Sequence, residues 1–146
     1  MVVANVAPPT VVVARGAWGT VECAVRPNGD APAASFLNTD LENLREKGKD
    51  EPKATARARF LVLFQQMADH GRVGTGKRFS KEMGQLYAFK HEVRHVQIRF
   101  PCFQDRNRWI LTHGFLKPGA QKKKGKWPAS EVARAEQIMS EYFQRR

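Results

Sequence analysis

The most regular pattern in the chain is an alternation of apolar and polar positions between residues 86 and 117. In its middle part, the positions on one side are Val96, Ile98, Phe100 and Cys102, and those on the other side are Gln97, Arg99 and Phe103. After a polar turn at residues 104–107, the positions that share one side are Trp109, Leu111, His113 and Phe115. A period of two over this length predicts three successive strands with one covered face. Pro101 cannot donate a ladder hydrogen bond, so we expect a bulge or an exposed edge there.

The remaining chain supplies an earlier strand and three helices. Residues 19–26 alternate as a strand and end at the turn residues 27–30. The spacing of apolar residues predicts helices over 31–47, 54–70 and 129–144, with Gly71 closing the second. Residues 1–14 are apolar but irregular, so we expect a flexible tail, with an edge strand at Val11–Val13 as the alternative. The order predicts one α+β domain over residues 15–146: a strand, two helices, a three-stranded antiparallel meander and a C-terminal helix.

Positive charge is concentrated in the second half of the chain. Of the formal net charge of +11, residues 1–71 contribute nothing, with 8 basic and 8 acidic residues, whereas residues 72–146 hold 17 basic and 6 acidic residues. Such polarisation is typical of proteins that bind a polyanion. Nucleic acid is the favoured partner, and an anionic membrane surface, an acidic protein or a merely solvated surface are the alternatives.

Several other classes of protein lack support in the sequence. No apolar run approaches the ~20 residues of a spanning helix, and the opening segment has no basic region typical of a signal peptide, so a cytoplasmic location is expected. Cys23 and Cys102 fall on apolar strand faces, which favours buried free thiols over a disulfide. The histidines and cysteines show no metal-binding spacing, and we expect neither a metal nor another cofactor.

Basic residues outside the alternating strands supply candidate contacts to a phosphate backbone. Residues 72–77 resemble a phosphate-binding loop only superficially, because they follow a helix and lead toward strands, so we interpret them as a linker. The lysine run after residue 121 is either a solvated loop or a grip on nucleic-acid phosphates. Trp127 beside it is expected to cap the core rather than to stack on a base. The residues predicted to contact RNA are Lys77, Arg78, His91, His95, Lys122, Lys123, Lys124 and Lys126.

A set of short motifs in a fixed order covers residues 18–142. The matching positions are Leu86, Tyr87, Ile98, Arg99, His113, Gly114, Phe115, Lys117, Pro128, Glu131 and Ala133. In joint order and spacing they resemble the RelE/HigB superfamily, and more narrowly its phage-derived HigB-like branch. The sequence departs from that pattern at Ala88, where an acidic residue is usual, and at Lys90, where arginine is usual.

The resemblance implies a RelE-like fold with a small curved mixed sheet. It also implies the toxin of a type II toxin–antitoxin system, a metal-independent endoribonuclease that cleaves mRNA, commonly on the ribosome. The implied partners are mRNA, the ribosome and a small cognate antitoxin, expected to carry a helix-turn-helix domain. Two alternatives remain open: a catalytically inactive RNA- or ribosome-binding module on the same fold, and a protein-interaction domain with an acidic partner.

Metal-independent RNA cleavage needs a base for the 2′-hydroxyl proton, cations around the phosphate and an acid for the leaving oxygen. The residues predicted to supply these groups are Lys90, Arg99, His113 and Lys117. Arg99 is the strongest candidate because a guanidinium clamps a phosphate, with an ordinary surface arginine as the alternative. His113 shares its parity with apolar neighbours, so a packed histidine is the alternative there. We expect Lys90, Arg99 and Lys117 to converge on one concavity, since cross-strand neighbours lie ~5 Å apart.

Overall fold

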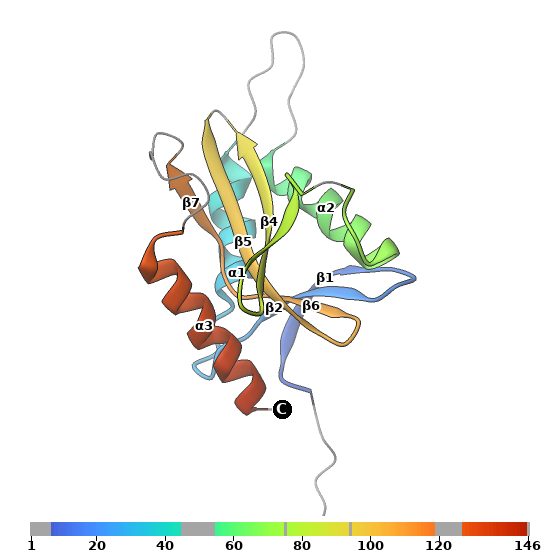
Figure 1. Ribbon diagram of the computed structural model, residues 1–146, viewed down its shortest axis with the longest axis vertical. Coiled ribbons are helices and arrows are strands. Elements are labelled where there is room, and N and C mark those ends of the chain that lie inside the picture. The colour runs from blue at the N-terminus through green and yellow to red at the C-terminus, as the bar shows by residue number, and fades with distance from the viewer. Residues whose placement is uncertain (1–6, 45–54, 75, 94, 119–126, 146) are drawn as a thin grey trace, which may run out of the picture.

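The structure is a computed structural model, and it describes residues 7–44, 55–74, 76–93, 95–118 and 127–145. In these residues seven strands form one curved, unclosed sheet in the order β1-β2-β6-β5-β4-β3, with β7 also paired to β5 (Figure 1). The strands are β1 (Thr10–Arg15), β2 (Thr20–Ala24), β3 (Phe79–Met83), β4 (Leu86–Val93), β5 (Val96–Asp105), β6 (Arg108–Leu111) and β7 (Phe115–Pro118). The β2–β6 pair is parallel and the other pairs are antiparallel, so the sheet is mixed.

Helices cover both faces of this sheet (Figure 1). They are α1 (Pro32–Ser35), the π-helical turn η1 (Phe36–Asp40), the 3₁₀ turn η2 (Leu41–Asn43), α2 (Ala56–His70) and α3 (Ala129–Gln144). The main core lies between α2 and one face, where Phe60 and Phe64 pack edge-on against Phe100 at ring distances of 4.8 and 5.4 Å. Burial of each of these rings contributes roughly 1.5–3 kcal/mol to the stability of the fold. The opposite face packs against α3 through Ile138 and Tyr142.

Local signals in the sequence explain where the helices begin and end. Thr55 caps α2 by accepting a hydrogen bond from the Ala58 backbone N–H at 3.1 Å, and Gly71 ends the helix with a left-handed φ of 72°. The predicted helices 54–70 and 129–144 and the predicted strand 19–26 are confirmed within a few residues. The predicted helix 31–47 is present as the continuous turns α1, η1 and η2 up to residue 43, and its expected end lies outside the described residues.

The sheet is larger than the four strands that the sequence predicts. Val11–Val13 lie in β1, which is the edge strand considered as an alternative to a flexible tail; residues 1–6 of that tail lie outside the described residues. The strand β3 was not predicted, because its five residues include two charged ones and follow a glycine-rich segment. It forms an antiparallel hairpin with β4 around Gly84, whose φ is 53°. The domain boundary at residue 15 stays a prediction.

The third predicted strand is also interrupted, and this changes which side its last residues face. Between the pairs Cys102–Leu111 and Arg99–Phe115, three steps along β5 are matched by four steps along the facing segment. One extra residue reverses the side on which the following side chains lie. Leu111 therefore packs in the core with α2, whereas Phe115 packs on the α3 side. The prediction that these two residues share a face was wrong.

Pro101 lies opposite this irregularity. The expected bulge or exposed edge at Pro101 itself was wrong, because Pro101 is buried and pairs with Ala88 in the continuous β4–β5 ladder. Its carbonyl accepts a hydrogen bond from the Thr112 backbone N–H at 2.9 Å. The N–H and C=O of a strand residue point to the same side, so the missing donor faces the place where β5 changes partner from β7 to β6. A proline is tolerated in an inner strand here because no ladder bond is required at that point.

Two further predictions concern the interior and the membrane. Cys23 and Cys102 are free and fully buried, as predicted, and burial raises the pKa of both thiols, that of Cys23 to about 12. Among the described residues, every helix is too short or too polar to cross a membrane.

Candidate functional site

Three predicted site residues come from three neighbouring strands and lie on one face of the sheet. Lys90 in β4 stands directly opposite Arg99 in β5, and Lys117 in β7 stands opposite Gln97 in β5. Directly opposed residues of antiparallel strands present their side chains on the same face, and residues two apart on one strand do so as well. Lys90, Arg99 and Lys117 are therefore neighbours on the face that α3 covers farther along.

The sheet is hollowed at this place. A cavity of about 840 Å³, which we call the cationic concavity, is lined by Lys77, Arg78, Lys90, His91, Glu92, Gln97 and Arg99. Lys90 and Arg99 thus share one concavity, as predicted. Lys117 does not line it and is only 3% exposed. It is nevertheless coupled to the other two cations, because its charge lowers the pKa of Lys90 and the charge of Arg99 lowers the pKa of Lys117.

Opposing effects act on the pKa of the Lys90 ammonium. Burial lowers its pKa, and the charges of Arg99 and Lys117 lower it further, whereas Glu82 acts in the opposite direction. The Nζ atom lies 3.8 Å from the Glu82 Oε1 atom, which also accepts a hydrogen bond from the Ser80 hydroxyl at 2.9 Å. A lysine in this position is a stronger proton donor than a solvated one.

Arg99 is oriented by groups of its own strand. Its Nη1 atom donates to the Ile98 carbonyl at 3.1 Å and its Nη2 atom donates to the Gln97 Oε1 atom at 2.9 Å. Burial lowers the pKa of Arg99, and the carboxylates of Glu82 and Glu92 oppose this effect. The pKa of Lys117 is lowered by burial and then by Arg99. A bound anion would relieve both the desolvation and the repulsion of these cations.

The other predicted RNA contacts are distributed unevenly. Lys77 and Arg78 line the cationic concavity. His91 lies at its margin, with its ring edge-on to Phe60 on the α2 side and its Nδ1 atom against the Arg78 guanidinium. His95 is exposed in the turn between β4 and β5, with a φ of 65°, and does not line the concavity. The predicted contacts Lys122, Lys123, Lys124 and Lys126 lie outside the described residues.

His113 stands apart from the three cations. It is fully buried, stacks on Phe115 at 5.7 Å, and its Nδ1 atom is 3.0 Å from the Thr112 hydroxyl. Its Nε2 atom has no hydrogen-bond partner and lies 3.6 Å from a Glu131 oxygen. Burial lowers its pKa to about 4, with Arg134 and Arg26 acting in the same direction. This environment matches the packed histidine that the sequence offered as the alternative.

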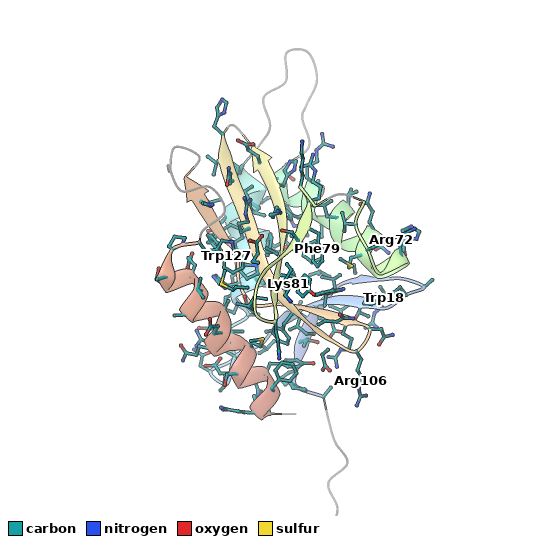
Figure 2. The ribbon with its side chains drawn as sticks, in the orientation of Figure 1. Trp18, Arg72, Phe79, Lys81, Arg106 and Trp127 are labelled. Atoms are coloured by element: carbon teal, nitrogen blue, oxygen red, sulfur yellow. The ribbon has the colours of Figure 1, made fainter. Side chains whose placement is uncertain are left out.

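Two further residues of the concavity and one residue beside it were missed from the sequence. Glu82 pairs with Lys90, Glu92 adds an exposed carboxylate to the lining, and Gln97 orients Arg99. The strand parity of Lys90 and Arg99 already placed Glu92 and Gln97 on their face, so parity was a usable signal for these two. Glu82 had no such signal because β3 was not predicted. Trp127 is buried edge-on against Phe115, 5.6 Å away, as predicted for a core cap (Figure 2).

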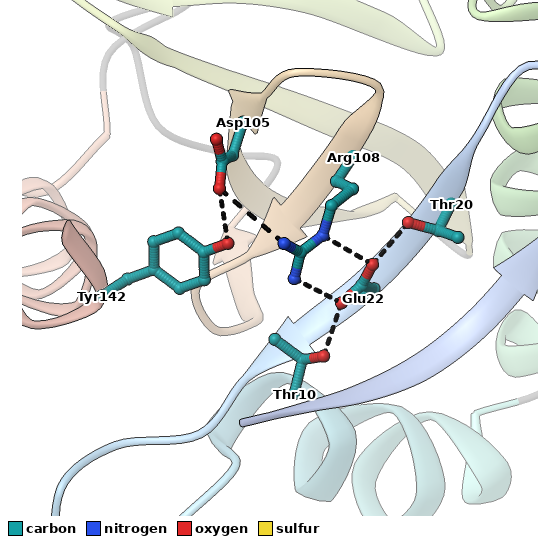
Figure 3. Close-up of polar contacts among 6 residues, drawn as sticks. All are labelled: Thr10, Thr20, Glu22, Asp105, Arg108 and Tyr142. Atoms are coloured by element: carbon teal, nitrogen blue, oxygen red, sulfur yellow. Dashed lines mark hydrogen bonds and ion pairs between the residues drawn. The ribbon is translucent and has the colours of Figure 1, made fainter. Parts of the chain in front are cut away.

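A second polar cluster lies on the same sheet face, under the C-terminal end of α3 (Figure 3). This closed cluster consists of Thr10, Thr20, Glu22, Asp105, Arg108 and Tyr142. Arg108 donates two hydrogen bonds to the Glu22 carboxylate, at 3.0 and 2.9 Å, and Tyr142 donates one to Asp105 at 2.7 Å. Burial alone would raise the pKa of Glu22, but the hydrogen bonds from Arg108 and both threonines lower it to about 2.

The chemistry of the site also depends on whether the described part of the chain can hold a metal ion. This part holds no cluster of three or more histidine, cysteine, aspartate or glutamate side chains arranged to bind a metal ion. The arrangement that the structure does supply is a concave site built from ammonium and guanidinium groups with adjacent carboxylates. Such a site can bind a phosphate and exchange protons with it.

Comparison with known proteins gives one family. The family model described as "Phage derived protein Gp49-like (DUF891)" matches residues 50–140, which is more than half of the chain. The matched range includes the strands β3 to β7 and therefore all of the residues that line the cationic concavity. No curated protein matches the chain.

Proposed function

The chain belongs to the Gp49-like family of phage-derived proteins, a family of the RelE/HigB-like toxin superfamily, and on this premise we propose that it is a HigB-like toxin that cleaves mRNA. The family suggests a cognate antitoxin as partner. We propose further that this antitoxin is small and carries a helix-turn-helix domain, that the ribosome presents the mRNA, and that the toxin acts in the cytoplasm.

One observation carries the proposal: Lys90, Arg99 and Lys117 form a cluster of cations on one sheet face, at and beside an open concavity. The charge of the described lining is not balanced, since the four cations there face one carboxylate, Glu92, with Glu82 beside them. Cations that are partly buried and close together stabilise the transition state of phosphate cleavage, because it carries more negative charge than the substrate.

The lining also contains groups suited to the two proton transfers. In the proposed reaction, the 2′-oxygen attacks phosphorus while its proton passes to a base, for which the exposed carboxylate of Glu92 is available. The bond from phosphorus to the 5′-oxygen breaks, and the leaving oxygen takes a proton from Lys90. The products are a 2′,3′-cyclic phosphate and a 5′-hydroxyl. Arg99 holds the non-bridging oxygens throughout, because Gln97 and the Ile98 carbonyl fix its plane.

The test is cleavage of end-labelled mRNA by the purified protein, with and without ribosomes. We expect Arg99→Ala to reduce the cleavage rate about 1,000-fold and Lys90→Ala about 100-fold, in line with the loss of a charge-stabilising group or a general acid. Arg72→Ala and Lys81→Ala are matched controls, because both side chains are exposed and do not line the concavity (Figure 2). The controls should cleave within about twofold of the parent rate.

The outcomes separate the proposal from its alternative. If the parent protein binds RNA and ribosomes but leaves the RNA intact under all conditions, the chain is an inactive binding module. If the protein cleaves and both site variants cleave as fast as the two controls, the site assignment is wrong. Growth arrest on induced expression, absent in the Arg99→Ala strain, would link the cleavage to toxicity.

A further inference from the structure

A second groove lies on the other face of the sheet, between α2 and the strands β3 and β4. It has a volume of about 280 Å³ and is lined by Arg59, Val62, Leu63, Arg78 and His91. The first three residues belong to α2, Arg78 directly precedes β3, and His91 belongs to β4. We propose that this flanking groove binds the nucleotide beyond the two that the cleaved bond joins, and this proposal rests on the proposed function of the cationic concavity.

The two cavities adjoin at an edge of the sheet and share part of their lining. Arg78 and His91 line both the flanking groove and the cationic concavity. The strand β3 begins at Phe79, which pairs with Phe89, and in the part of the chain that the structure describes one more backbone hydrogen bond follows, from Lys90 N–H to the Arg78 carbonyl at 2.8 Å. Among the described residues, β4 from His91 onward thus has no β3 partner and becomes the edge of the sheet there. A flexible chain can pass around this edge from one face to the other.

Strand parity places the groups of this passage on alternate faces. Lys90 and Glu92 face the α3 side, while His91 between them faces α2 and meets the Phe60 ring at 6.0 Å. Successive side chains of one strand thus offer a cation to one cavity and an aromatic ring to the next. This spacing suits a ligand in which charged and flat groups alternate, as in single-stranded nucleic acid.

The flanking groove combines positive charge with exposed apolar surface. Arg59 and Arg78 supply two guanidinium groups, and the Val62 side chain, which also lines the groove, is 55% exposed, although most large apolar side chains among the described residues are buried. Guanidinium groups bind phosphates, and apolar surface beside them accommodates an unstacked base. A double helix could not bend around a strand edge in this way, so the ligand class is single-stranded RNA.

The experiment measures equilibrium binding of two non-cleavable probes, a 2′-O-methyl adenine dinucleotide and a 2′-O-methyl oligoadenylate decanucleotide. Arg59→Gln is expected to weaken decanucleotide binding about fivefold and to reduce the slope of its salt dependence by about 0.7, as for the loss of one phosphate contact to a single strand. Dinucleotide binding should stay unchanged, because one phosphate occupies the concavity alone. Val62→Ser should weaken decanucleotide binding about threefold without changing the salt slope, since it removes only base contact.

Arg72→Gln is the control, because it removes an exposed arginine near the end of α2 that does not line either cavity. The proposal is overturned if Arg59→Gln and Val62→Ser bind the decanucleotide as Arg72→Gln does, or if they weaken both probes equally. Circular dichroism melting identifies an Arg59 variant that does not fold, and Val62→Ser then decides the matter because its site is exposed. Failure of the proposed function shows differently, as absent cleavage by the parent protein with the length-dependent binding intact.

Discussion

The closed cluster and the cationic concavity occupy the same face of one sheet, yet their charges behave in opposite ways. In the closed cluster, the hydrogen bonds with Glu22 raise the pKa of Arg108, the cation of the cluster. In the concavity, burial and neighbouring cations lower the pKa of Lys90, and burial lowers that of Arg99. The counter-charges explain the difference, because Arg108 donates two hydrogen bonds to the Glu22 carboxylate, whereas the Lys90 ammonium lies 3.8 Å from the Glu82 carboxylate and close to two other cations. The helix α3 adds Tyr142 to the closed cluster and does not line the concavity.

The direction of the pKa shift therefore distinguishes a structural cation from a candidate binding cation. A cation whose pKa is raised has found its counter-charge within the protein and stabilises the fold. A cation whose pKa is lowered by burial and by like charges costs folding free energy, and an incoming anion can recover it. On this criterion Arg108 has a structural role, and Lys90, Arg99 and Lys117 are candidate binding cations.

The largest predicted effect on stability is in the closed cluster. Glu22→Gln keeps the shape of the side chain but removes the charge that balances Arg108, whose side chain is only 23% exposed. We expect the free energy of unfolding, measured by urea denaturation at neutral pH, to fall by about 3 kcal/mol. Lys90→Ala should change it by less than about 1 kcal/mol, because the lost attraction to Glu82 over 3.8 Å is offset by relief of the desolvation and repulsion that lower the Lys90 pKa.

A second arm tests whether the Glu22–Arg108 pair is the cause. The double variant Glu22→Gln/Arg108→Gln should regain part of the lost stability, because it no longer leaves a partly buried guanidinium without its counter-charge. A loss of less than about 1 kcal/mol in Glu22→Gln would mean that this pair is no stronger than an exposed ion pair, and the contrast between the clusters would disappear.

Much of the fold follows from local patterns in the sequence. The alternation around Arg99 correctly separated the Phe100 side from the Phe103 side, and Gly71 correctly ended the second helix. The errors arose where tertiary pairing overrides the local pattern. The five residues of β3 are too few and too polar for a periodic signal, and they form a strand because β4 supplies the partner. The extra residue before Phe115 became visible only through its register against β5.

The candidate site was predictable to the extent that it lies on regular strands. Lys90 and Arg99 were found because parity and cross-strand pairing of long strands are readable from sequence. Glu82 was missed with its strand, and Arg59 and Val62 were missed because they belong to a helix, where nothing in the helical period indicates a neighbouring sheet edge. The catalytic role of His113 stays a prediction; its burial beside Glu131 of α3 could not be read from the strand pattern.

His113 extends the comparison to the pH dependence of stability, because it is a buried group under α3 whose neutral state is favoured. Its pKa of about 4 lies below the ordinary value of 6.5, so its contribution to stability is complete above about pH 6.5 and is lost as the pH falls toward 4. The surrounding charges are Glu131, Arg134 and Arg26. We expect the free energy of unfolding to fall by about 2 kcal/mol between about pH 7 and about pH 5 from this group alone.

The measurement is urea denaturation across that pH range for the parent and for His113→Phe, which can retain the stacking on Phe115. The variant should lose this part of the pH dependence, and His70→Gln, at an exposed histidine, should keep it. If the free energy of unfolding of His113→Phe depends on pH as steeply as that of the parent, burial under α3 does not hold His113 in its neutral state. Glu22 affects a lower range, from about pH 4.5 to about pH 2, because its pKa is depressed.

The smallest predicted effect concerns Glu82, the carboxylate beside the cationic concavity. Whereas loss of the Glu22 charge should lower stability, loss of the Glu82 charge should raise affinity for RNA. Glu82→Gln removes the charge 3.8 Å from the Lys90 ammonium, so the concavity becomes more positive and binds a phosphate more tightly. We expect the affinity for the decanucleotide probe to rise about fivefold, or about 1 kcal/mol, at constant ionic strength, with a change in stability of less than about 1 kcal/mol. Glu136→Gln adds the same charge at an exposed site on α3 and should raise the affinity far less, since screening weakens distant charges.

A fall in affinity would mean that Glu82 holds Lys90 in its binding position. A stability loss as large as that of Glu22→Gln would show instead that both clusters are structural, and that an open face does not by itself mark the cations of a binding site.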